Sequence, residues 1–346
     1  MFPLPQSEIH RRGLMLSPRR STAAVLFEIR RSYMKRRILP QLVAASVACL
    51  LAGAVNAAGV LAPDDDEDDL VPNGKGWGER AYPTHPNGNG NGQAGKGNPS
   101  GANGITYHGG PLILGTTNVY YIWYGNWTGN SATTILTDLA TNLGGSGYFN
   151  INTTYYNGSN THVSNSVHYA GSTTDNYSQG KALSDGQIQS VVASAISSSR
   201  VSKDTNAVYF VLTSADVTAT SGFCTQYCGW HTHGIISGSD IKYAFIGNPD
   251  RCPSACEAQT TGPNGNAGAD GMASIISHEL EEAVTDPDLN AWYDRRGMEN
   301  ADKCAWTFGT TYQANGAMAN MRVGSRDYLI QRNWVNASGG FCSTTY

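Results

Sequence analysis

The chain has few charged residues and a small net charge. Asp, Glu, Lys and Arg make up 14% of its 346 residues, and the formal net charge is −4. Its basic residues concentrate before Ile38, so the rest of the chain offers no basic patch for a nucleic acid. It also has no phosphate-binding loop of the G-x-x-x-x-G-K-S/T type and no G-x-S-x-G nucleophile motif. The sequence therefore predicts no nucleic-acid partner and no serine hydrolase of that type.

Glycine and polar, β-forming residues are abundant instead. The chain has 40 Gly and 18 Tyr, and Asn, Ser and Thr are frequent. Low charge with this composition is typical of secreted proteins that are rich in strands and loops.

The N-terminal 57 residues predict an export signal preceded by an extension. Met34 begins a basic segment, residues 38–54 form an apolar run, and Val55-Asn56-Ala57 is a small-residue cleavage site. The run has the length of a signal core and is short for a membrane span. We predict a start at Met34, cleavage after Ala57, and a secreted, extracellular or wall-associated product without a stable membrane span.

Six of the seven cysteines follow this signal, because Cys49 lies within it. An even number of cysteines in an exported chain predicts disulfides. The two C-x-x-x-C pairs favour local bridges, which leaves the last two cysteines to join the C-terminal segment. A zinc site with four cysteine ligands is the alternative. The cysteines concerned are Cys224, Cys228, Cys252, Cys256, Cys304 and Cys342.

The chain divides into an unfolded linker and one folded domain. Residues 58–104 combine an acidic run with a Gly/Asn/Pro-rich segment, which cannot bury enough apolar surface to fold. Residues 105–346 alternate strand and helix patterns. We expect strands at 118–124, 151–156, 163–170, 207–212, 241–246 and 328–334, and helices at 131–143, from 184, and at 272–284. This order predicts a single α/β sandwich with a mixed sheet flanked by helices.

The helix at 272–284 carries the strongest chemical pattern, Ser277-His-Glu-Leu-Glu-Glu282. His278 and Glu282 are four residues apart and share one helix face, and Glu279 lies beside it. Zinc peptidases use this arrangement as H-E-x-x-H, whereas here Glu282 replaces the second histidine. We predict a zincin-like metal site with His278 and Glu282 as ligands and Glu279 as general base. The third ligand would come from the following loop: Asp302, Glu299, Asp288 or Asp286.

Several alternatives remain open for this segment. A set of one imidazole and carboxylates suits manganese or iron as well as zinc. Asp286, Asp288, Asn290 and Asp294 follow calcium-loop spacing, although the required glycine and final glutamate are missing. The residues could also form a hydrogen-bond network or an exposed charged helix face.

His231 and His233 form a separate H-x-H pair. On a strand, residues two apart share a face, a spacing that metal sites use. They could equally pack and hydrogen-bond beside the neighbouring cysteines.

Several segments together resemble the EXORDIUM/phosphate-induced-protein family. They are ITYHGGP at 105–111, NVYYIWYGNW at 118–127, LSDGQIQSVV at 183–192, LTSADV at 212–217, GFCTQYCGWH at 222–231, CPSAC at 252–256 and GADGM at 268–272. They occur in family order, and the resemblance spans residues 105–346. It implies secretion and an extracellular role linked in plants to growth, without an established enzymatic activity.

The chain departs from the plant pattern at the His278 helix. Plant members typically have an apolar helix there that ends in a T-x-P turn, which Thr285-Asp286-Pro287 resembles. The acidic helix instead resembles a microbial-type branch. His231 matches the plant pattern, which favours a structural role, and His233 lies outside it. Two functions follow: a metal-dependent, peptidase-like hydrolase, or a non-catalytic extracellular signalling, polypeptide-binding or glycan-binding protein.

Overall fold

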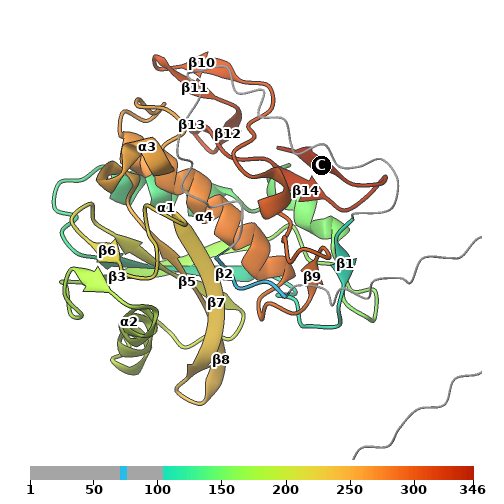
Figure 1. Ribbon diagram of the computed structural model, residues 1–346, viewed down its shortest axis with the longest axis horizontal. Helices are drawn as coiled ribbons and strands as arrows, with labels where there is room; N and C mark the ends of the chain where they lie inside the picture. Colours follow the sequence, from blue (N-terminus) through green and yellow to red (C-terminus); the bar gives the residue numbers. More distant parts are fainter. Residues whose placement is uncertain (1–70, 76–103) are drawn as a thin grey trace, which may run out of the picture. The chain divides into compact units, whose positions relative to one another are not determined.

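A computed structural model describes residues 71–75 and 104–346 (Figure 1). The predicted signal peptide, its cleavage site and Cys49 lie outside the described residues.

A five-stranded mixed sheet forms the centre of the domain, in the order β3-β2-β5-β8-β7. Its strands are parallel except for β7, which pairs antiparallel with β8. Every residue of β5 is buried, as a central strand covered on both faces requires. The strands are β2 (Thr117–Tyr124), β3 (Val167–Asp175), β5 (Ala207–Thr213), β7 (Gly229–Ile236) and β8 (Ser239–Ile246).

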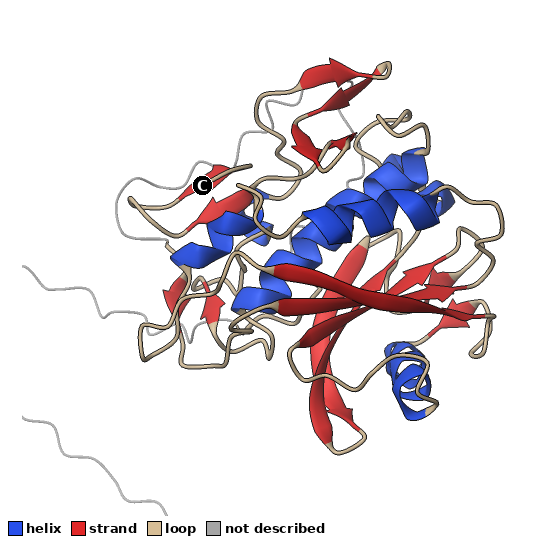
Figure 2. Ribbon diagram, turned by 180° about the vertical axis from the view of Figure 1, so that it is seen from behind, coloured by secondary structure: helices blue, strands red, loops and turns tan. Residues whose placement is uncertain are grey.

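Helices cover both faces of this sheet (Figures 1 and 2). Helix α2 (Asp185–Ser197) lies on one face, and α1 (Ala132–Asn142) and α4 (Ala267–Thr285) lie on the other. Helix α2 begins with a capping box, in which Ser184 and Gln187 bond each other's backbone N–H. The predicted α/β fold with a mixed sheet flanked by helices is confirmed.

Short elements complete the fold, and most of them lie in the C-terminal segment that packs over α4 (Figure 1). The two-stranded pairs are β1 (Thr106–Tyr107) with β9 (Trp292–Tyr293), β4 (Ala182–Leu183) with β6 (Thr218–Ala219), β10 (Tyr312–Ala314) with β11 (Ala317–Ala319), β12 (Met321–Val323) with β13 (Arg326–Tyr328), and β14 (Asn333–Val335) with β15 (Phe341–Ser343). The short helices are η1 (Phe149–Thr154), η2 (Pro249–Arg251), α3 (Pro253–Cys256) and η3 (Asp302–Cys304).

The strand predicted at 151–156 is wrong, because this segment forms the 3₁₀ helix η1. Thr153 and Thr154 donate their hydroxyls to backbone carbonyls three residues earlier, at 2.8 and 2.7 Å. Such local bonds compete with strand pairing. The strand predicted at 163–170 begins later, at Val167, and the late strand at 328–334 is divided between β13 and β14.

The C-terminal disulfide is confirmed, and the two local bridges are wrong. Cys304 pairs with Cys342, but the other bonds are Cys224–Cys252 and Cys228–Cys256. Cys252 immediately precedes α3 and Cys256 ends it, and both cysteines are bonded to the segment before β7. All six cysteines are therefore in disulfides, which also excludes the four-cysteine zinc site.

Within the predicted linker, the structure describes residues 71–75, which contact the domain. Pro72 and Gly74 are buried against the domain. Within the parts of the chain that the structure describes, no helix combines the length and apolarity that crossing a bilayer requires.

Candidate metal centre

Helix α4 lies in the interior, between the sheet and the C-terminal segment (Figure 2). Asn266 caps its N-terminus by accepting the N–H of Ala269 at 3.0 Å, and the helix ends at Thr285, before Pro287 as predicted. Every residue from 272 to 287 is buried. The alternative of an exposed charged helix face is therefore wrong, and the polar side chains of α4 must find partners inside the protein.

The first part of the site joins α4 to the loop after it. His278 Nε2 lies 3.0 Å from Glu282 Oε1 and 3.6 Å from Asp302 Oδ1. The backbone N–H of Asp302 donates to Glu282 Oε1 at 3.0 Å. All three side chains are at most 1% exposed. The sequence-predicted ligands His278, Glu282 and Asp302 thus converge.

The second part joins α4 to strand β7. His231 Nε2 lies 3.6 Å from the other carboxylate oxygen of Glu282, and 3.2 Å from Glu299 Oε1. The backbone N–H of Glu299 donates to Asp302 Oδ2 at 3.2 Å. Glu282 therefore bridges two imidazoles, one through each oxygen. Below, "the buried cluster" means His231, His278, Glu279, Glu282, Glu299 and Asp302.

Glu279 belongs to the same cluster. Its carboxylate, His231 and Glu282 each offer a ligand atom, and these atoms lie within 4.8 Å of one another. Glu279 Oε1 also lies 3.1 Å from the position that a Cβ on Gly229 would take. The predicted base is thus beside the predicted ligands, but it is only 1% exposed.

Burial shifts the protonation of this cluster. It raises the pKa of Glu282 to about 7, with Asp302 adding to the rise, and it raises the pKa of Glu299 well above its usual range. It lowers the pKa of His231 to about 3, so that imidazole is neutral at neutral pH. A neutral imidazole is the form that binds a metal ion.

The donor atoms form two groups that share Glu282, and within each group, His231–Glu279–Glu282 or His278–Glu282–Asp302, they lie close enough for a metal ion. Two ligands that are each about 2.0–2.1 Å from a tetrahedral zinc lie roughly 3.3 Å apart. The four imidazole–carboxylate separations above run from 3.0 to 3.6 Å. The two separations of 3.6 Å are too long for hydrogen bonds. Two imidazoles with carboxylates are also a donor set that suits zinc.

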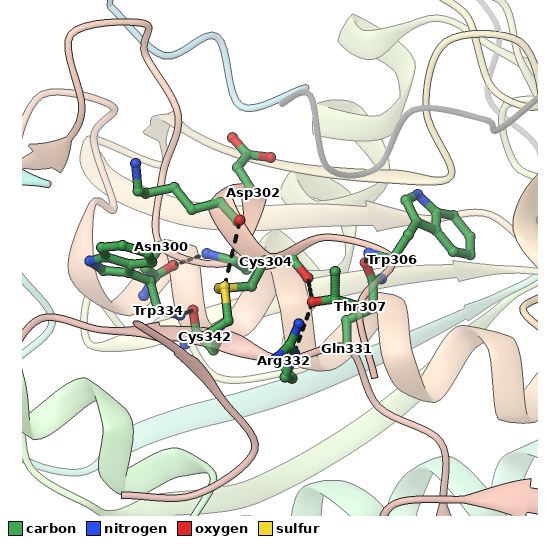
Figure 3. The surroundings of a disulfide bond; sticks show 12 residues. Asn300, Asp302, Cys304, Trp306, Thr307, Gln331, Arg332, Trp334 and Cys342 are labelled. Atoms are coloured by element: carbon green, nitrogen blue, oxygen red, sulfur yellow. Dashed lines mark hydrogen bonds between the residues drawn. A yellow bond between two sulfur atoms is a disulfide. The ribbon is translucent and has the colours of Figure 1, made fainter. Parts of the chain in front are cut away.

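Disulfides anchor the segments that carry these ligands. Cys304 lies two residues after Asp302 and is bonded to Cys342, and the structure around this bond is shown in Figure 3. Asp302 points away from the disulfide in that view. Cys228, bonded to Cys256, immediately precedes β7 and hence His231. The two disulfides therefore hold both the loop and the strand of the site.

His233 does not join the buried cluster. Its Nδ1 lies 2.8 Å from Asp240 Oδ1 and 3.6 Å from Asp288 Oδ1. Lys242 Nζ lies 2.5 Å from Asp240 and 3.6 Å from Asp288. This second group, "the lysine cluster" below, contains a cation from the chain itself. Asp288, proposed as a third ligand, belongs here.

The residues of the calcium-loop pattern do not come together in the described chain. Asp286 Oδ1 accepts the N–H groups of Asn290 and Ala291, both at 2.6 Å. Asp294 Oδ1 accepts those of Arg296 and Met298. These carboxylates stabilise the turn after α4, and among the described residues Asp286 belongs to none of the groups whose ligand atoms converge.

His231 is the site residue that sequence reasoning assigned to a structural role. The H-x-H spacing indicated that it faces the same side as His233. Only the antiparallel pairing of β7 with β8 brings that side against α4.

Comparison with known proteins identifies the family of the folded domain. The family pattern described as "Phosphate-induced protein 1 conserved region" matches residues 105–327. The chain belongs to this family, which includes the EXORDIUM proteins. No solved structure matches the chain.

The curated relatives are plant proteins. Protein EXORDIUM-like 3 of Arabidopsis thaliana is 32% identical over 271 residues, covering 66% of this chain and 80% of the relative. Protein EXORDIUM-like 5 of the same plant is 32% identical over 273 residues, covering 66% and 75%. Protein PHOSPHATE-INDUCED 1 of Nicotiana tabacum is 30% identical over 293 residues, covering 69% and 88%.

Proposed function

We propose that this chain is an extracellular EXORDIUM-family protein whose domain is held together by a buried zinc ion. The observation that carries the proposal is Glu282, which reaches His278 with one oxygen and His231 with the other. Asp302 completes the set from the loop after α4. The ion would bring the carboxylates back to their charged form and join β7, α4 and η3.

The burial of the site supports a structural ion. Closed zinc sites with all positions filled by protein are structural, whereas catalytic sites keep a position open to water and substrate. His231, His278, Glu279 and Glu282 are each 1% exposed. The function supported best is therefore that of a non-catalytic extracellular protein, which acts by binding a polypeptide or glycan partner.

Secretion is supported by the three disulfides, which persist in oxidising compartments. The sequence adds the predicted signal peptide. The His-Glu-x-x-Glu helix sets the chain apart from the apolar helix expected of plant members, and we assign it to a microbial-type branch of the family.

Metal-dependent hydrolysis is the second candidate function, favoured by the position of Glu279 beside His231 and Glu282. A carboxylate there could take a proton from a metal-bound water. This activity requires the closed site to open to a substrate.

Elemental analysis of the purified secreted protein tests metal binding. Zinc, manganese, iron and calcium should be measured together in the wild type, His278→Ala and Glu279→Gln. We expect about one zinc per wild-type chain, loss of zinc in His278→Ala, and retention in Glu279→Gln. Equal zinc in the wild type and His278→Ala would contradict the proposal, and manganese, iron or calcium in its place would correct the ion.

Hydrolysis needs a separate measurement. Wild type and Glu279→Gln, both loaded with metal, should be incubated with a mixed peptide library. Cleavage by the wild type alone would establish the second candidate. No cleavage by either protein leaves the structural ion as the function of the site.

A further inference from the structure

Residues 71–75 lie along the outer edge of the central sheet. Strand β7 is the last strand in the sheet order, so its far side has no neighbouring strand. The backbone N–H of His231 points to that side and donates to the carbonyl oxygen of Gly74 at 3.1 Å. The short blue segment in Figure 1 is this peptide. Among the described residues, this single main-chain hydrogen bond joins the peptide to the edge of β7.

Close backbone contact explains the glycine at position 74. Its φ is +67°, and a Cβ on it would lie 1.9 Å from the His231 carbonyl oxygen. Any side chain at this position would therefore push the segment away from β7. Pro72 and Gly74 are buried, whereas Val71 is 64% exposed.

The ammonium group of Lys75 contacts one carboxylate and two aromatic rings. Its Nζ lies 2.5 Å from Asp185 Oδ2, and 5.6 and 5.5 Å from the ring centroids of Tyr227 and Trp230. An ammonium group held by one carboxylate and two aromatic rings is stabilised by ion pairing and by cation–π attraction. Ser221 donates to Asp185 Oδ1 at 2.6 Å, which fixes the carboxylate.

The site and its occupant come from different parts of the chain. Asp185, Tyr227, Trp230 and His231 all lie within the family region, 105–327. Residues 71–75 lie outside it. The domain therefore provides a complete site for a Gly-Lys segment, and the segment itself is an addition in front of the domain.

We propose that the edge of β7, with Asp185, Tyr227 and Trp230, is a docking site for a polypeptide segment that carries a Gly-Lys pair. Residues 71–75 occupy this site within the same chain and compete with a partner segment. The backbone edge holds the main chain of the segment, and the carboxylate of Asp185 with the rings of Tyr227 and Trp230 selects lysine. This inference does not require a bound metal.

A peptide-binding measurement tests the proposal. A fluorescein-labelled Val-Pro-Asn-Gly-Lys peptide is titrated with full-length wild type, Gly74→Ala and Gly104→Ala, and anisotropy is recorded. Gly74→Ala displaces the internal segment, whereas a Cβ on Gly104 meets nothing within 4 Å. We expect Gly74→Ala to bind the peptide at least about 10-fold more tightly than the other two proteins. Replacing the peptide's lysine with alanine should abolish that binding.

Two results would overturn the proposal: equal binding to all three proteins, or no binding to folded Gly74→Ala. If Gly74→Ala does not fold, Lys75→Ala replaces it, because it removes the contacts with Asp185 and the two rings and leaves the backbone unchanged. Tighter peptide binding by Lys75→Ala than by wild type supports the proposal, and equal binding overturns it. Chelator-treated protein should give the same results, which separates this test from that of the zinc ion.

Discussion

Two groups of imidazoles and carboxyls lie along the same side of β7, and they balance their charge differently. His231 enters the buried cluster, and His233, two residues later, enters the lysine cluster. His231 is 1% exposed, while the side chain of His233 is 36% exposed. In the lysine cluster, Lys242 supplies a cation beside Asp240 and Asp288.

The comparison shows why only one of the two groups is proposed to hold a metal. A group that already contains an ammonium, partly in contact with water, gains little from a second cation. In the buried cluster, burial chiefly, with neighbouring carboxyls adding to it, raises the pKa of Glu282 and Glu299. A divalent ion bound there would hold these carboxyls in their charged form.

The largest effect is expected from the disulfide next to Asp302. Cys304→Ser with Cys342→Ser opens a loop of sequence separation 38 and should lower the free energy of unfolding by about 3–4 kcal/mol. It should also reduce bound zinc, because Asp302 is no longer held near His278. Chemical denaturation and elemental analysis measure the two effects.

The matched control is Cys224→Ser with Cys252→Ser, whose separation is 28. It should cost a similar free energy and retain zinc, because Cys228–Cys256 still anchors β7. Equal zinc content in the two double variants would show that the buried cluster does not depend on the position of Asp302.

A smaller effect is expected at Glu257, a buried carboxyl outside both groups. Burial, with Asp250 nearby, raises its pKa from 4.5 to about 7. The folded protein holds this proton more tightly than the unfolded chain, so the contribution of Glu257 to stability is greatest below pH 4.5 and is lost as the pH rises to about 7. In Glu257→Gln, the decrease in the free energy of unfolding over this pH range should be smaller by on the order of 1 kcal/mol. Denaturation midpoints of the wild type and Glu257→Gln across that pH range measure this difference. Parallel plots of midpoint against pH for the two proteins would contradict the prediction.

The smallest effect is expected in the lysine cluster. Lys242→Ala removes ion pairs with partners that are 18–30% exposed, so the free energy of unfolding should fall by roughly 0.5–1 kcal/mol. The zinc content should not change. Loss of zinc from Lys242→Ala would mean that the two groups are coupled. It would contradict the distinction between the buried cluster and the lysine cluster.

Local sequence patterns predict most of the central sheet and its helices. The apolar runs of β2, β5 and β8 and the helix start expected at residue 184 agree with the structure, because they depend on short-range geometry and burial. The segment of η1 was missed because Asn and Thr form local bonds that an alternating pattern does not reveal. The pairing of Cys224 with Cys252 depends on how α3 meets the segment before β7, which spacing does not encode.

The candidate site was predictable from the sequence except for His231. His278, Glu279 and Glu282 follow from helix periodicity, and Asp302 and Glu299 from their place in the next loop. His231 requires knowledge of the strand order, because β7 reaches α4 only through its pairing with β8. Adding His231 to the candidate site raises its number of imidazoles from one to two, which favours zinc as the ion.

The central claim is that the buried cluster binds a zinc ion through His231 as well as His278. The most direct measurement is the zinc-to-protein ratio of three purified secreted proteins: the wild type, His231→Ala and His233→Ala. The two histidines lie on one strand and face the same side, so each variant controls for the other. We expect a ratio near one in the wild type and in His233→Ala, and near zero in His231→Ala. Equal ratios in all three proteins would contradict the account.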